Sequence, residues 1–250
     1  MSSPNVIGVV SGKGGVGKTT TAINFSTALH DFREEVTLVD ANLKNPNVLL
    51  HLDLPHVPIA LQHVLNDGID IRHTIRVHHS GLRIVPSLIS FNQRDANLEN
   101  LKHVVRQLEG TVVIDAPAGI DEDTKHIINA TNQLLVVLTP DVPAVTDAAK
   151  TIKYAKEINK KIVGLVVNRV KNDAYELTPD EIEIMCETPI IASIPEDDNI
   201  RKSIFSSTPV VRYNPYSPAT VQYQSLAAKL LSIPYDPPRS SLWRRLLSVF

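Results

Sequence analysis

Residues 12–19 of the chain read Gly-Lys-Gly-Gly-Val-Gly-Lys-Thr. This stretch fits the pattern G-x-x-x-x-G-K-[ST] of a phosphate-binding loop, with an apolar run before it and a helix-like segment after it. Glycines let the backbone turn sharply and aim successive N–H groups at phosphate oxygens, and the helix N-terminus adds a partial positive charge. The sequence therefore predicts a site for the phosphates of a nucleotide.

Short apolar runs alternate along the chain with helix-like segments. The runs expected as strands are Val6–Val10, Val36–Val39, Leu82–Val85, Val112–Ile114, Leu134–Leu138, Ile162–Val167 and Ile190–Ile194. The expected helices are Thr19–His30, Glu99–Leu108, Asp121–Ala130, Val145–Ile158 and Pro179–Cys186. Unbroken apolar strands occur where helices cover both faces of a sheet. The pattern predicts an α/β fold with a doubly wound, mostly parallel sheet flanked by helices.

Length and composition exclude several classes of protein. The 250 residues are 43% hydrophobic and 21% charged, as expected of a globular chain with its own core. Lys and Arg number 25 against 27 acidic residues, so the net charge does not indicate a nucleic-acid binder. The one cysteine, Cys186, excludes a disulfide framework. We expect no signal peptide, and no apolar run reaches the roughly 20 residues that span a bilayer.

Lysine, threonine and aspartate side chains predict a magnesium site beside the loop. Lys18 is expected to bridge the outer phosphates, and the hydroxyl of Thr19 to ligate Mg²⁺. The apolar run 112–114 ends at Asp115. A carboxylate at the carboxyl end of a parallel strand lies next to such a loop, where it can hold a water bound to Mg²⁺.

Residues 13–20, Lys-Gly-Gly-Val-Gly-Lys-Thr-Thr, resemble the deviant Walker A motif of the MinD/ParA family of ATPases. Residues 115–119, Asp-Ala-Pro-Ala-Gly, resemble the switch II of the same family. The resemblance implies a P-loop NTPase fold of the SIMIBI type, with ATP and Mg²⁺ as ligands. In the family, the equivalent of Lys13 crosses the interface of an ATP-sandwich homodimer to the nucleotide of the other subunit. By resemblance, Lys13 senses the terminal phosphate and couples ATP to dimerisation.

Residues 37–42, Thr-Leu-Val-Asp-Ala-Asn, resemble the family's switch I, which usually reads Asp-x-Asp. By resemblance, Asp40 lies behind the direct ligands of magnesium and helps to hold them in place. Asn42 replaces the second acid, which in related ATPases helps to orient or activate the attacking water. A carboxamide accepts a hydrogen bond but cannot take a proton. We therefore predict slow hydrolysis, or hydrolysis that depends on other groups.

Two later segments resemble the family's base-binding elements. In MinD-like proteins an Asn-Arg pair, here Asn168-Arg169, and an Ile-Pro-Glu-Asp loop, here residues 194–197, flank adenine. They favour ATP over GTP, and the guanine-reading Asn-Lys-x-Asp pattern is absent from the sequence. The expected nucleotide-binding residues are Gly12, Lys13, Gly14, Gly15, Val16, Gly17, Lys18, Thr19, Thr20, Asn168, Arg169, Pro195, Glu196 and Asp197. The expected metal residues are Thr19, Asp40 and Asp115, and the expected catalytic residues are Lys13, Asp40 and Asn42.

The last residues of the chain form a separate region. We divide the chain into an ATPase domain at 1–232, a proline-rich tether at 233–239 and an amphipathic helix at 240–250. On a helical wheel the apolar and basic side chains separate. The residues expected to contact a membrane are Leu242, Trp243, Arg244, Arg245, Leu246, Leu247, Val249 and Phe250. The segment resembles the membrane-targeting helix of MinD-like proteins; docking on its own domain is the alternative.

The predicted function is a MinD-like ATPase that dimerises on ATP, binds an anionic membrane surface reversibly and positions a partner such as the division site. Its expected location is the cytoplasm and the inner face of the cell membrane, and its partners include an unidentified protein regulator or cargo. Three alternatives stay open: a ParA-type partitioning ATPase, an FlhG-type flagellar-positioning ATPase, and a nucleotide-gated membrane scaffold with little turnover. The balanced charge argues against DNA as a partner.

Overall fold

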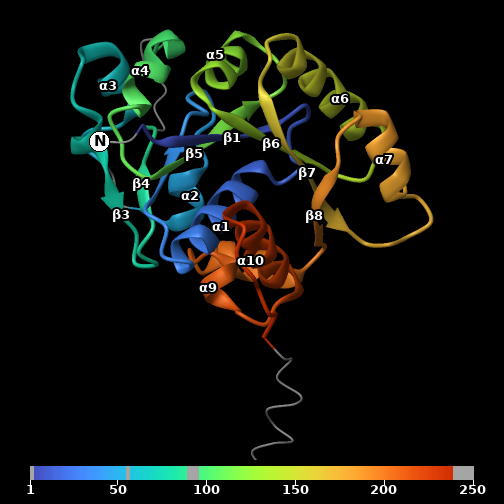
Figure 1. Ribbon diagram of the computed structural model, residues 1–250. Helices are drawn as coiled ribbons and strands as arrows, with labels where there is room; N and C mark the ends of the chain where they lie inside the picture. Colours follow the sequence, from blue (N-terminus) through green and yellow to red (C-terminus); the bar gives the residue numbers. More distant parts are fainter. Residues whose placement is uncertain (1–2, 55–56, 89–95, 239–250) are drawn as a thin grey trace, which may run out of the picture.

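The computed structural model describes residues 3–54, 57–88 and 96–238 of the chain. The predicted membrane helix at 240–250 lies outside the described residues. A single sheet with the strand order β3-β4-β2-β5-β1-β6-β7-β8 runs through the molecule (Figure 1). Its strands are β1 Asn5–Ser11, β2 Val36–Asp40, β3 Arg76–Val77, β4 Arg83–Val85, β5 Thr111–Ala118, β6 Gln133–Leu138, β7 Lys161–Val170 and β8 Ile190–Pro195. Every pairing is parallel except β3 with β4, which confirms the predicted fold class.

Helices cover both faces of the sheet. They are α1 Lys18–Asp31, α2 Val48–Leu52, α3 Leu61–Asp67, α4 Leu101–Val105, α5 Glu122–Ala130, α6 Val142–Glu157, α7 Pro179–Cys186, α8 Asp198–Phe205, α9 Val210–Tyr213 and α10 Pro218–Leu231, with short 3₁₀ turns at Ile71–Thr74 and Leu98–Asn100. In Figure 1, α3 to α6 lie above the sheet and α1, α9 and α10 below it. None of the helices in the described parts of the chain is long and apolar enough to cross a membrane.

The alternating side chains of the strands build two cores. On β1, Val6 and Val10 belong to the core between the sheet and helices α3 to α7. Ile7 and Val9 belong to the core on the opposite face, between the sheet and α1, α9 and α10. Successive side chains of a strand point to opposite faces, so a strand covered on both faces must be apolar throughout. This requirement is why the unbroken apolar runs marked the strands so clearly in the sequence.

The helix boundaries follow local capping. α7 begins at Pro179, as predicted, because Thr178 and Glu181 form a reciprocal capping box. α6 begins at Val142 and not at the predicted residue 145, because the carboxylate of Asp141 accepts the N–H of Ala144 and caps the helix earlier. The helix expected over 99–108 is shorter, since a 3₁₀ turn precedes α4 and α4 ends at residue 105.

Several elements were not predicted: β3, α2, α3, α8, α9 and α10. The longest of them, α10, packs against α1 and buries the ring of Tyr223. It ends at Leu231, and Ser232 follows with a φ of 55°, a left-handed residue that terminates the helix. The described part of the proline-rich segment comes directly after this helix.

The carboxyl ends of the central strands meet at one edge of the sheet. β1 lies between β5 and β6, and the glycine loop leaves its end to enter α1. Asp40 at the end of β2 pairs in register with Asp115 on the neighbouring β5. In open α/β sheets this edge is where ligands bind, so the fold gathers the loop and both carboxylates at one place.

Candidate functional site

The loop that joins β1 to α1 is shaped by two glycines. A Cβ atom at Gly12 would lie 2.2 Å from the backbone carbonyl of Asp147 in α6, so the loop can pass α6 only without a side chain there. Gly17 has a φ of 88°, and a Cβ atom on it would lie 2.1 Å from the amide nitrogen of Asn168. A left-handed turn at this point sets the first N–H groups of α1 toward the cavity, as an anion site at a helix N-terminus requires.

Lys18, Thr19 and Asp115 form a polar cluster at the start of α1, in which Lys18 and Asp115 are buried and Thr19 is half-buried. The Nζ atom of Lys18 lies 2.9 Å from one carboxylate oxygen of Asp115. The hydroxyl of Thr19 donates to the other oxygen at 2.6 Å. The structure thus brings together the three side chains that the sequence assigned to phosphate and magnesium.

Asp40 is the second buried carboxylate of the cluster. Its two oxygens accept the backbone N–H groups of Asn42 at 3.2 Å and Val48 at 3.1 Å. Burial and the neighbouring Asp115 raise the pKa of Asp40 to about 8, although those two N–H groups and Lys18 oppose the shift. In the empty site at neutral pH, Lys18 therefore balances the charge of Asp115 while Asp40 keeps its proton, and a bound cation would take the place of that proton.

The donors of the cluster suit Mg²⁺. A threonine hydroxyl and carboxylate oxygens are hard ligands, which this ion prefers, and it usually combines one or two carboxylates with phosphate oxygens and water. Thr19 and Asp115 would hold the ion or its water, with Asp40 behind them. The fit rests on the chemistry of these side chains and on the second carboxyl group, Asp40, buried beside Asp115.

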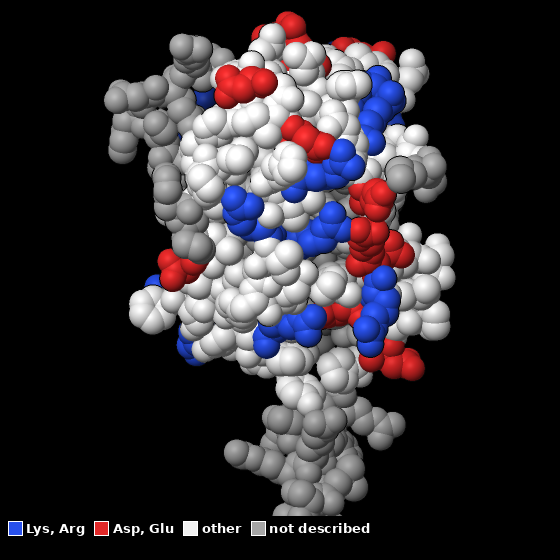
Figure 2. All heavy atoms as spheres, turned by 90° about the vertical axis from the view of Figure 1, so that its left-hand side faces the viewer, with Lys and Arg blue, Asp and Glu red and all other residues white. Residues whose placement is uncertain are grey.

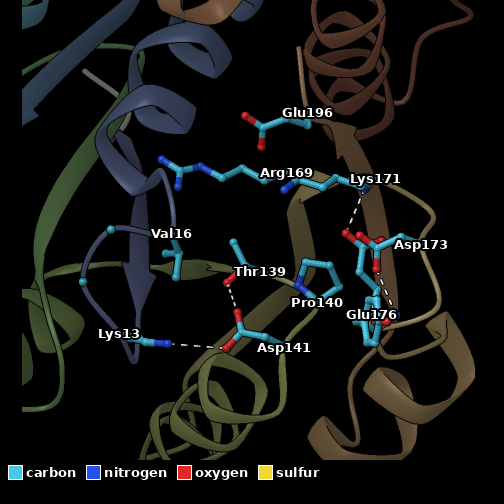
Figure 3. Close-up of a pocket in the computed structure, with 13 residues that line it drawn as sticks. Lys13, Val16, Thr139, Pro140, Asp141, Arg169, Lys171, Asp173, Glu176 and Glu196 are labelled. Carbon is cyan, nitrogen blue, oxygen red and sulfur yellow. Dashed lines mark hydrogen bonds and ion pairs between the residues drawn. The ribbon is translucent and has the colours of Figure 1, made fainter. Parts of the chain in front are cut away.

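Two adjoining cavities open over the loop. The first, the switch cavity, has a volume of about 550 Å³ and is lined by Lys18, Thr19, Thr20 and Asn42, among others. The second, the β7 cavity, has a volume of about 580 Å³ and extends past Val16 toward the residues after β7 and β8 (Figure 3). The walls of both include Lys13, Gly14, Gly15 and Arg169. An elongated ligand could therefore lie across the loop from one cavity into the other.

Lys13 stands at the rim between the cavities. Its side chain is 44% exposed, and its Nζ atom lies 3.4 Å from a carboxylate oxygen of Asp141 (Figure 3). Burial alone would raise the pKa of Asp141, but hydrogen bonds from Thr139 and Ala144, together with Lys13, hold it below its ordinary value. Lys13 is thus tethered by an exposed ion pair and is open to contact from outside the chain.

The Asn168 side chain is turned toward the loop. Its amide nitrogen donates to the backbone oxygen of Val16 at 2.7 Å, and its own oxygen is buried without a partner among the described residues. Asn168 therefore braces the loop from below in this structure, rather than facing the β7 cavity as a reader of adenine. Its neighbour Arg169 has a φ of 58° and extends its side chain toward the loop (Figure 3).

Of the residues Pro195, Glu196 and Asp197, Glu196 lines the β7 cavity, and the other two line neither this cavity nor the switch cavity. Pro195 pairs in register with Val170 at the end of β8. Asp197 caps α8 by accepting the N–H of Asn199, and it also accepts the N–H of Ala219 at the start of α10. The structure does not bring Asp197 to the predicted base site, because its carboxylate is used to join these two helices.

Two residues of the switch cavity were missed by sequence reasoning. Lys44 is exposed and forms ion pairs with Asp123 at 2.6 Å and Asp121 at 3.7 Å. His51 on α2 is half-buried, and burial lowers its pKa although Asp115 opposes the shift. Neither lies in a recognisable motif; the only available signal was that both follow switch I closely in the sequence.

The comparison with protein families gives one match that covers most of the chain. A model of the CobQ/CobB/MinD/ParA nucleotide-binding domain matches residues 7–210. This range includes the loop, both carboxylates, the Asn168-Arg169 pair and the loop after β8.

Individual relatives match along nearly the whole chain. The chain is 36% identical over 234 residues to an uncharacterized ATP-binding protein of Methanocaldococcus jannaschii, covering 92% of this chain and 89% of that protein. It is 31% identical over 238 residues to the septum site-determining protein MinD of Synechocystis, covering 90% and 88%. Its fold matches that of the Pyrococcus horikoshii MinD complexed with Mg-ADP with a TM-score of 0.86 at 28% identity, covering 91% of this chain and 96% of that one.

Proposed function

Because the chain belongs to the CobQ/CobB/MinD/ParA nucleotide-binding family, we propose that it works as a MinD-like ATPase that dimerises on ATP and binds a membrane reversibly. ATP and Mg²⁺ are its ligands, and its reaction class is that of MinD/ParA-family ATPases. The observation that carries this proposal is the cluster of Lys18, Thr19 and Asp115 at the mouth of the glycine loop.

The residues of the two cavities divide the nucleotide between them. Lys18 and the N–H groups at the start of α1 bind the phosphates in the switch cavity, and the base lies toward Arg169 and Glu196 in the β7 cavity. Thr19 and Asp115 hold magnesium or its water. When bound, magnesium would supply positive charge that offsets the negative charge of the phosphate oxygens while the terminal phosphoryl group passes to water.

The predicted homodimer is supported by the position of Lys13. Its side chain lies at the rim of both cavities, is nearly half exposed and has only the exposed carboxylate of Asp141 as an ion-pair partner among the described residues. An exposed pair of this kind contributes at most about 1 kcal/mol, so exchanging it for a phosphate of a second copy costs little. Lys13 would then connect ATP binding to dimerisation.

Slow turnover is supported by Asn42. The residue is 9% exposed and lines the switch cavity, where the corresponding acid of related ATPases helps the attacking water. A carboxamide there can orient a water but cannot remove its proton. This feature also favours the second candidate function, a nucleotide-gated membrane scaffold in which ATP acts as a binding switch.

Membrane association rests on the sequence of residues 240–250. One short amphipathic helix binds lipid marginally, because ordering it offsets much of the gain from its apolar side chains. Two such helices on a dimer gain effective concentration, so membrane affinity would follow the nucleotide state. Arg244 and Arg245 would add a preference for anionic lipid. The partner positioned on the membrane is an unidentified regulator or cargo.

A DNA-partitioning role receives less support. Figure 2 shows one face of the molecule, on which Lys and Arg side chains lie among Asp and Glu side chains. Interspersed charges of this kind lack the single-sign stripe that usually tracks a phosphate backbone. Together with the net charge of −2, this arrangement gives no support to DNA as a partner.

The proposal is tested by co-sedimentation with anionic vesicles in Mg-ATP, Mg-ADP and no nucleotide, alongside light scattering to measure mass. We expect ATP alone to give dimers and vesicle binding. The variant Leu246→Glu should dimerise but remain unbound, and Lys18→Ala should do neither. Equal vesicle binding without nucleotide, or a monomer in a nonhydrolysable ATP analogue, contradicts the proposal. Phosphate release that vesicles do not stimulate favours the scaffold over the cycling ATPase.

A further inference from the structure

His51 is a polar side chain in the switch cavity that no motif explains. It lies on α2, whose first residue, Val48, donates its backbone N–H to the carboxylate of Asp40 at 3.1 Å. The helix is therefore fixed at its start to the buried carboxylate pair. His51 lies one helical turn later, at the wall of the switch cavity. A displacement of Asp40 would therefore move the start of α2 with it.

The ring of His51 is half-buried and has no hydrogen-bond partner among the residues that the structure describes. Half-buried imidazoles usually find a partner, since a buried donor without one costs free energy. In either protonation state the ring carries at least one N–H group. His51 therefore offers an unused donor to whatever fills the switch cavity.

The position of His51 indicates which end of a bound nucleotide would lie next to it. His51 and Asn42 line the switch cavity and not the β7 cavity, whereas Glu196 lines the β7 cavity and not the switch cavity. If the base lies toward Glu196 and the phosphates on the loop, the phosphate chain runs toward Asn42 and His51. The last phosphate is the one that ATP has and ADP lacks.

We propose that His51 donates a hydrogen bond from its ring to the terminal phosphate of bound ATP. The inference rests on the proposed ATP binding and adds a residue that distinguishes ATP from ADP. Because Val48 already fastens the same helix to Asp40, the contact would give α2 a second attachment that exists only while the terminal phosphate is present. Switch I would then be ordered by two attachments in the ATP state and by one in the ADP state.

The test measures affinities for a nonhydrolysable ATP analogue and for ADP, both with Mg²⁺, by calorimetry on the full chain. A hydrogen bond to a charged group is worth about tenfold or more in affinity. We expect His51→Ala to weaken the analogue about tenfold and ADP by less than about twofold, and His51→Gln, which keeps a donor, to recover part of the loss. Leu50→Ala, at the exposed neighbouring position on α2, should change neither affinity.

A second measurement follows the ring itself. In protein labelled with ¹⁵N-histidine, the His51 resonance, assigned from its loss in His51→Ala, should shift with the analogue and not with ADP. An unchanged ratio of the two affinities in His51→Ala overturns the inference, and so does an equal loss of both, which would indicate a structural role. A wild-type protein that binds neither nucleotide overturns the proposed function as well, which separates that failure from the failure of the His51 contact alone.

Discussion

Two aspartates at the ends of parallel strands, Asp40 on β2 and Asp197 after β8, each accept two backbone N–H groups. Their surroundings differ. Asp40 is fully buried and faces Asp115, whereas Asp197 is half-buried and is also bonded by the hydroxyl of Ser217. Burial raises the pKa of Asp40 to about 8; at Asp197 burial is outweighed by hydrogen bonds, which hold its pKa below the ordinary value.

The comparison shows that backbone hydrogen bonds alone do not make a carboxylate a structural group. Asp197 has donors enough to stabilise its charge, so it serves the fold by joining α8 to α10. Asp40 is buried beside a second carboxylate, Asp115, so it keeps a proton in the empty site and can give that proton up when a cation binds. A strand-end aspartate like Asp40 is suited to a cation, whereas one like Asp197 is not.

The largest expected effect is the loss of protein stability when Asp197 is replaced. Asp197→Ala removes a helix cap and leaves the N–H of Ala219 and the hydroxyl of Ser217 without their acceptor. We expect the free energy of unfolding to fall by about 3 kcal/mol at pH 7, measured by urea denaturation. The exposed neighbour Asp198→Ala should change it by less than about 0.5 kcal/mol. Equal losses in both variants would show that Asp197 is not the joint between the helices.

Asp40 should behave in the opposite way. A group whose pKa is raised in the folded state stabilises the fold below its unfolded pKa, and that contribution is lost as the pH rises toward the folded value of about 8. In the nucleotide-free protein, Asp40→Asn should therefore gain about 2 kcal/mol in unfolding free energy relative to the wild type as the pH rises from 5 to about 6.5. The pH slope is the readout because the carboxamide keeps only one acceptor oxygen. A variant with the wild-type slope would mean that Asp40 is not protonated in the empty site.

The central sheet and the phosphate site could be predicted because their signals are local. A strand covered on both faces must be apolar at every residue, and the glycine loop needs its residue types at fixed spacing. The edge strand Arg76–Val77 has only two residues and no apolar run, so it left no such signal. Helix α10 was missed although Pro218 stands in its first turn, because the buried face around Tyr223 is defined only by contact with α1.

The use of each site side chain could not be predicted in the same way, because it depends on neighbours far away in the chain. Asn168 donates to Val16, which lies 152 residues earlier. Asp197 is held by residues of α10, and His51 reaches the switch cavity only because α2 is fastened to Asp40. The motifs predicted which residues gather at the strand ends. They did not predict which of those residues face the ligand and which hold the fold together.

A third test adds a negative charge near Asp40. Asn42→Asp places an acid on the wall of the switch cavity, beside the carboxylate pair. If turnover is limited by the missing acid, phosphate release with Mg-ATP should rise about tenfold or more, since positioned acids and bases contribute at least that much. Asn45→Asp, on the same cavity wall outside switch I's Asp-x-Asp position, serves as the control. An unchanged rate in Asn42→Asp would remove Asn42 as the reason for slow hydrolysis.

The smallest expected effect concerns a carboxylate that is exposed, Asp141. Its side chain and that of Lys13 are both 44% exposed, so their ion pair is screened by water, unlike the buried pair of Lys18 with Asp115. Asp141→Asn keeps an oxygen that can cap α6 and removes only the charge that tethers Lys13. We expect the free energy of unfolding to change by less than about 0.5 kcal/mol, while the ATP-dependent dimer forms at least as readily because Lys13 is released. A loss of stability close to that of Asp197→Ala would contradict this, because it would show that the exposed carboxylate of Asp141 supports the fold as strongly as that of Asp197.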